Sequence, residues 1–101
     1  MSRSINRLPH QPVERTLKAL SGRWKALIIY HLAGGDRRFS DLLARLVGIS
    51  PQVLVRQLRE LEAHGVVRRT SGPRRRVCYE LTELGQALPP MLAALCAWGQ
   101  A

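Results

Sequence analysis

"GISPQVLVRQLRELEAHG", residues 48–65, predicts a helix with two unlike faces. Leucines recur along it at the i, i+4 and i+7 spacing of one helix face, which is the stripe expected to face a core. That stripe consists of Leu54, Leu58 and Leu61. The opposite face has i, i+3, i+4 and i+7 spacing and is polar and basic apart from one valine. It consists of Gln52, Val55, Arg56 and Arg59.

The start of this helix and the segment before it indicate a helix-turn-helix. Ser50 can cap the helix, and Pro51 would occupy the first helical position, where its missing N–H costs nothing, so we expect the helix to begin at Pro51. A shorter helix is expected over residues 40–46, with Ser40 as its cap and Gly48 as its stop. Two helices joined by a few residues that include a glycine form a helix-turn-helix.

The rest of the chain predicts two helices before this unit and a β-hairpin and a helix after it. Apolar residues recur at helical spacing over residues 13–20 and 23–33, with glycines after each segment. Two β-prone runs, 66–70 and 76–82, flank turn-forming residues and predict a hairpin. A final helix is expected over residues 83–99. The fold class is α+β, mainly helical: a winged helix-turn-helix with a two-stranded hairpin as its wing and a helix at each end.

Composition favours a folded domain with a polyanionic partner. A chain of 101 residues fits one domain, and its 46% apolar content is too high for a disordered basic tail. The formal net charge of +9 favours nucleic acid first and an anionic membrane second. The longest apolar run has eight residues, far short of the roughly 20 that span a bilayer, and no signal-peptide stretch opens the sequence. We therefore expect a cytoplasmic protein that binds no membrane, with residues 1–11 as a flexible basic arm.

Residues for catalysis or metal binding are not grouped in the sequence. The two cysteines, Cys78 and Cys96, make no disulfide framework, and the three histidines show no metal-ligand spacing. The chain has no glycine-rich phosphate loop, nucleophile elbow or evident carboxylate pair. We expect no enzyme activity, no metal and no cofactor. Cys78 is either an accessible thiol that senses oxidants or, as for most lone cysteines, inert.

Positive charge gathers around the predicted hairpin. Seven arginines and only two acidic residues lie between positions 56 and 76, whereas a merely solubilising surface would interleave the signs. Gln52 and Arg56 have the donors and acceptors that match adenine and guanine edges, and Val55 can meet a thymine methyl or pack against the preceding helix. Arg59 on the same helix face and Ser50 at the start of the helix are also expected to contact DNA. At the hairpin tip, Arg74, Arg75 and Arg76 are expected to contact phosphates or enter a minor groove, the alternative being that they only solvate the loop. Arg38 and Ser40 are weaker phosphate candidates, and Arg23 and Lys25 are weaker still.

The last predicted helix lacks a polar face. Thr82 can cap it, and Pro89-Pro90 requires either a kink or a fresh helix start, because a proline inside a helix costs about 3 kcal/mol. The following "MLAALCAW", residues 91–98, is apolar all round, so it needs cover on every side, more than one small domain can supply. We expect a second copy of the chain to cover it. The interface residues would be Val13, Leu17, Leu88, Leu92, Leu95, Cys96 and Trp98.

From Pro12 to Gly99, the sequence resembles the HxlR-type bacterial transcriptional regulators. The matching stretches are "PVERTLKALSGRWKALIIYHL", "RRFSDLLARLVGISPQVLVRQLRELEAHGVVRR", "VCYELTELG" and "LCAWG", in that order. The resemblance implies a homodimer that binds operator DNA with a helix in the major groove and the hairpin as a wing. The chain departs from the family pattern at two positions. Gln11 replaces a common cysteine through which several members sense oxidants or electrophiles, and Val55 replaces the usual Ser or Thr.

These observations predict one winged helix-turn-helix domain over residues 12–101, with the helix-turn-helix at 40–64, the wing at 66–82 and a dimerisation helix at 83–99. The expected function is sequence-specific regulation of transcription by a homodimer on a roughly palindromic site in double-stranded DNA. The alternative is a winged-helix interaction module that binds an acidic protein. Neither the operator nor a small-molecule inducer can be identified from the sequence.

Overall fold

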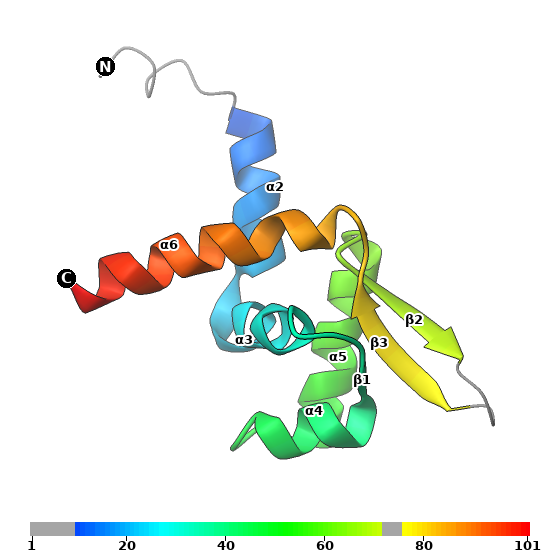
Figure 1. The fold of residues 1–101 in the computed structure, drawn as a ribbon. Coiled ribbons are helices and arrows are strands. Elements are labelled where there is room, and N and C mark those ends of the chain that lie inside the picture. Colours follow the sequence, from blue (N-terminus) through cyan, green and yellow to red (C-terminus); the bar gives the residue numbers. More distant parts are fainter. Residues whose placement is uncertain (1–9, 72–75) are drawn as a thin grey trace, which may run out of the picture.

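The protein folds around a central helix, with the helix-turn-helix at one end and two long helices at the other (Figure 1). The computed structural model describes residues 10–71 and 76–101. In chain order the elements are α2 (His10–Leu20), α3 (Gly22–Leu32), β1 (Arg37–Arg38), α4 (Phe39–Arg45), α5 (Pro51–Ala63), β2 (Val67–Ser71), β3 (Val77–Leu81), the 3-10 turn η2 (Gly85–Ala87) and α6 (Leu88–Gln100). The β2–β3 hairpin projects to one side of this body.

Helix α5 forms as its sequence predicts. It begins at Pro51, and the backbone N–H of Val53 donates to the Ser50 hydroxyl oxygen at 3.2 Å, which confirms the cap. Its leucine stripe is at most 1% exposed. The turn before it contains Gly48, which has φ +94°, a left-handed conformation that side chains rarely adopt. The turn spans residues 46–50 and so is slightly longer than expected.

The core lies where α3 meets α5, α4 and the sheet. Ile28 and Ile29 of α3 are completely buried, as is Leu42 of α4, and Val67 and Leu81 close the core from the strands. Helix α3 therefore supports the helix-turn-helix, because α4 and α5 both pack against it through this core. None of the helices within the described ranges is long and apolar enough to cross a membrane.

The sheet has three strands, not the two of the predicted hairpin. Its order is β1-β3-β2, with both pairs antiparallel. In the added pair, Arg37 lies opposite Tyr79 and Arg38 opposite Cys78. Because this pairing keeps the chain extended through Arg38, α4 begins at Phe39. The expectation that Ser40 caps α4 is thus wrong: Arg38 holds the cap position, and Ser40 lies in the first turn.

The segment after the sheet resolves the question raised by the two prolines. Thr82 caps a turn rather than a long helix, since its hydroxyl accepts from the Gly85 N–H at 3.0 Å and donates to the Gly65 carbonyl. Helix α6 then starts afresh at Leu88, with Pro89 and Pro90 in its first turn, where a missing N–H costs least.

At the N-terminus, α2 begins at His10. The arm predicted over residues 1–11 therefore wrongly includes the first two residues of this helix. Residues 1–9 of that arm lie outside the described residues.

Replacing Gly85 by alanine is expected to lower the free energy of unfolding by about 1–3 kcal/mol, the usual cost of overpacking a core. A Cβ at this position would lie 2.1 Å from the carbonyl oxygen of Val66, which is backbone and cannot swing away. Urea denaturation of G85A and of the control Gly99→Ala, where a Cβ meets nothing within 4 Å, measures the difference. Equal stability of the two variants would contradict this packing.

Candidate nucleic-acid interface

The outer face of α5 presents the residues expected to contact bases. Gln52, Arg56 and Arg59 are all exposed, while Val55 is half-buried. The leucine stripe holds the opposite face of α5 against the core. Rotating α5 to turn these polar side chains inward would therefore expose the leucines to water. The Ser50 hydroxyl at the start of the helix is half-buried and already accepts a hydrogen bond, so only its proton is left for a phosphate.

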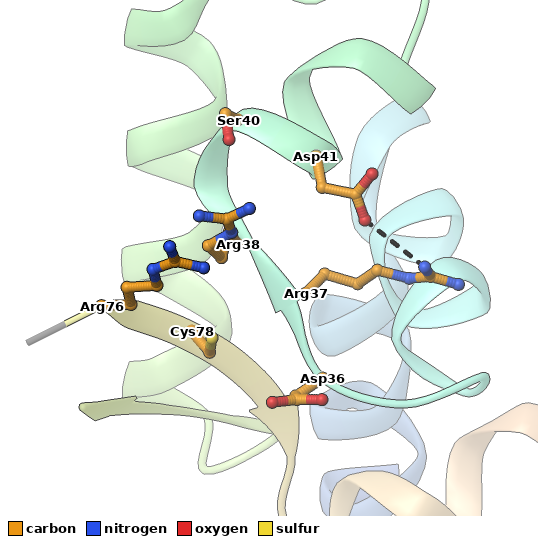
Figure 2. A pocket seen from close by; sticks show the side chains of 7 residues that line it. All are labelled: Asp36, Arg37, Arg38, Ser40, Asp41, Arg76 and Cys78. Carbon is orange, nitrogen blue, oxygen red and sulfur yellow. Dashed lines mark hydrogen bonds and ion pairs between the residues drawn. The ribbon is translucent and has the colours of Figure 1, made fainter. Parts of the chain in front are cut away.

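A basic hollow lies between the start of α4 and the end of β3 that is nearer the hairpin tip. It has a volume of about 470 Å³ and is lined by Asp36, Arg37, Arg38, Ser40, Asp41, Arg76 and Cys78. The hollow brings Arg76 together with Arg38 and Ser40, which lie 38 and 36 positions earlier in the sequence. Figure 2 shows Arg37 turned toward Asp41 and away from these three side chains.

Ion pairs divide the arginines around this hollow into two groups. The guanidinium of Arg37 lies 3.4 Å from the Asp41 carboxylate and also donates to a backbone carbonyl, and Arg45 lies 3.2 Å from the same carboxylate. Arg38 and Arg76 form no ion pair with any residue in the described part of the chain. They are the two arginines of the hollow that can still neutralise an anion.

The positive charge of Arg37 and Arg45 also affects a neighbouring histidine. Partial burial, followed by the charges of Arg45 and Arg37, lowers the pKa of His31 below its usual value, and Asp41 opposes the shift. The protonated, positively charged form of His31 is therefore disfavoured.

The wing contributes further positive charge. Arg69 is exposed on β2, and Arg68 lies 3.7 Å from Glu80 across the β2–β3 pair, so part of its charge is compensated. The predicted phosphate contacts of Arg74 and Arg75 fall outside the described residues.

Lys25 is not the phosphate contact that the sequence suggested. It is 4% exposed, and its ammonium donates to Gln57 Oε1 at 2.9 Å and to Glu60 Oε1 at 2.6 Å, both on α5. The hydrogen bond from Lys25, and then its charge, lower the pKa of Glu60; desolvation opposes this, and the charges of Arg56 and His64 add to the lowering. The sequence did contain a signal that Lys25 is buried. Lys25 lies at helical spacing before Ile28, Ile29 and Leu32, the other buried residues of α3.

Apolar side chains without cover lie on α2, α3 and α6. Of the predicted interface residues, Leu17 is 63% exposed, Leu95 58% and Trp98 82%, and Val13 and Cys96 are exposed as well. Leu88 does not belong with them, because it is only 8% exposed and packs into the core of its own chain. Leu92 is half-buried against that core.

A groove runs between α3 and α6. Its volume is about 820 Å³, and its lining includes Leu27 and Tyr30 of α3 with Leu92, Leu95 and Cys96 of α6. The sequence reasoning missed the two α3 residues, because the run "LIIY", residues 27–30, is apolar at consecutive positions and shows no outer face. Leu27 is 40% exposed and Tyr30 66%.

Neither cysteine is bonded, and Cys78 is half-buried at the basic hollow. Within residues 10–71 and 76–101, no group of three or more His, Cys, Asp or Glu side chains could hold a metal ion.

Comparisons with known proteins agree with this geometry. A family model described as HxlR-like helix-turn-helix matches residues 19–101. The HTH-type transcriptional regulator YtcD of Bacillus subtilis (strain 168) is 44% identical over 89 residues, covering 86% of this chain and 71% of YtcD. Among solved structures, the redox regulator HypR in its reduced form has a TM-score of 0.79 at 38% identity and covers 88% of this chain and 90% of its own. The reduced transcriptional regulator YodB from B. subtilis has a TM-score of 0.82 at 33% identity, covering 90% and 91%.

Proposed function

The chain belongs to the HxlR-like helix-turn-helix family of transcriptional regulators, and from this premise we propose that it is a homodimer that regulates transcription by binding a roughly palindromic operator. The observation that carries the proposal is the exposed face of α5, with Gln52, Arg56 and Arg59 held outward by a fully buried leucine stripe. A rigid helix of this kind is what a helix-turn-helix inserts into the major groove.

Base recognition falls to the first half of α5. The Arg56 guanidinium can donate two hydrogen bonds to guanine O6 and N7, and the Gln52 amide can pair with adenine N6 and N7. Val55 is half-buried, which suits contact with a thymine methyl at the edge of the helix. Arg59 lies farther along the helix, where the groove begins to diverge from it.

Phosphate contacts fall to the basic hollow and the wing. Arg38 and Arg76 carry charges with no partner in the described ranges, and the Ser40 hydroxyl beside them can donate to a phosphate oxygen. Arg74 and Arg75 extend this set on sequence grounds. These contacts position the protein on the duplex and make its affinity depend on salt.

Dimerisation supplies the second recognition helix. The exposed apolar side chains of α2 and α6, joined by Leu27 and Tyr30 of α3, form a surface that a second copy can cover. A two-fold dimer of helix-turn-helix units presents its helices about 34 Å apart, one turn of B-DNA, so each half-site is the inverse of the other.

Selection of bound fragments from the source genome tests the proposal. We expect a recurring motif with inverted half-sites, and an affinity for it that exceeds random duplex by about 10³-fold or more. Titrations at several salt concentrations should show a steep loss of affinity. Uniform recovery of the genome, together with salt-sensitive capture of an acidic protein, would contradict the proposal.

Mild oxidation is expected to leave operator affinity unchanged within about twofold. The chain has Gln11 at the position where relatives commonly have the sensing cysteine, and Gln11 is exposed on α2. Binding is measured before and after peroxide treatment, with Cys78→Ser as the control. A severalfold loss of affinity in the wild type that is absent from C78S would make Cys78 a redox switch.

A further inference from the structure

Lys25 is a buried cation whose two partners both belong to the proposed recognition helix. Its side chain is 6% exposed, and its ammonium spans from α3 to Gln57 and Glu60, which lie 32 and 35 residues further along the chain. The two acceptors are three positions apart, so they share the face of α5 that is turned toward α3.

The surrounding packing does not need a lysine at this position. Desolvating an ammonium costs several kcal/mol, and apolar residues of similar volume often stabilise a fold as well or better. Leu54, Leu58 and Leu61 already hold α5 against the core. Lys25 therefore adds a specific polar connection between α3 and α5.

The position of Glu60 indicates what that connection does. Glu60 follows Arg56 by four residues, the spacing at which opposite charges pair on a helix, and it adjoins Arg59. Yet Glu60 is bonded to Lys25 at 2.6 Å, and neither Arg56 nor Arg59 forms an ion pair within the described residues. Residues four apart are neighbours on a helix surface, and the charge of Arg56 also contributes to the lowered pKa of Glu60.

We propose that Lys25 is a positioning residue for DNA recognition, which holds the Glu60 carboxylate against α3 and thereby leaves Arg56 free for the operator. Without Lys25, Glu60 would turn toward Arg56 and bring a negative charge near the DNA phosphates. This inference rests on the proposed function of α5 as the recognition helix.

Measuring operator and random-duplex affinity for Lys25→Met, alone and combined with Glu60→Gln, tests the inference. We expect K25M to weaken operator binding about fourfold, since an i, i+4 ion pair shifts populations about twofold and acts once in each of two subunits. The K25M/E60Q double variant should return to within about twofold of the wild type, because it has no carboxylate left to capture Arg56. Lys18→Met, which removes the same charge from an exposed site on α2, is the matched control.

A role in stability alone would give a different pattern. The second substitution would then leave the binding defect of K25M in place, and that outcome, or wild-type affinity in a folded K25M, would overturn the inference. If instead the wild type showed no preference for any operator, the proposed function itself would fail, which is a separate result.

A second pair of variants covers the case in which K25M does not fold. Glu60 is 46% exposed, so changes there are tolerated more easily. Glu60→Asp keeps the charge but shortens the reach to Lys25, and should weaken operator binding about as much as K25M. Glu60→Gln keeps the acceptor without the charge and should not. The reverse order would also overturn the inference.

Discussion

Arg56→Ala is expected to weaken operator binding by about 2–6 kcal/mol and random-duplex binding by much less. A bidentate arginine–guanine pair contributes about 1–3 kcal/mol of discrimination, and a homodimer on a palindrome makes the pair twice. Arg56 is exposed, and no described residue pairs with it, so its removal leaves the fold of α5 unaltered. Binding isotherms on the selected operator and on a scrambled duplex give the ratio of the two affinities.

The matched control removes charge from the wing. Neutralising Arg74, Arg75 and Arg76 together should weaken binding to operator and scrambled duplex alike. Each lost phosphate contact should lower the slope of log affinity against log salt by about 0.9 per subunit. Arg59→Ala should fall between the two. If Arg56→Ala proved as indiscriminate as the wing variant, α5 would be only a positive surface and the assignment of base recognition to it would fail.

Helix α5 was predictable because its signals are local. The leucine period, the Ser50 cap and Pro51 at the first helical position all lie within residues 50–61, and they agree with one another. The same holds for the hairpin, where β-prone runs flank turn residues. Strand β1 had no such signal. It is two residues long and exists only because Arg37 and Arg38 pair with residues of β3 that lie 42 and 40 positions later in the chain.

Individual site residues were harder to predict than the elements that carry them. Lys25 was assigned to the surface by residue type, but its place among the buried positions of α3 turns it toward α5. Leu88 was grouped with the apolar tail, but the fresh start of α6 at this residue directs it into the core. In both cases the decisive information is the packing of two helices distant in sequence, which periodicity within one segment does not contain.

That distinction determines which residue should be changed to test dimerisation. Leu92→Asp would place a charge against the core of its own chain and so unfold the protein, whatever its oligomeric state. Leu95 is 58% exposed on the neighbouring turn of α6 and lines the groove beside Leu27 and Tyr30. A charge at Leu95 is solvated in a monomer and buried only in a dimer.

Leu95→Asp is therefore expected to leave the monomer folded and to raise the dimer dissociation constant about a thousandfold or more. Burying an unpaired carboxylate costs several kcal/mol, and each 1.4 kcal/mol raises the dissociation constant tenfold. Because the interface is two-fold symmetric, it would contain two such carboxylates. Light scattering at micromolar concentration should give the mass of one chain, and operator affinity should collapse toward that of a single half-site. Leu84→Asp, an equal change of charge at a leucine that is 64% exposed outside α2, α3 and α6, should remain dimeric. A folded L95D that stayed dimeric would show that this face is not the interface, and the second recognition helix would have to be brought to the DNA by another surface.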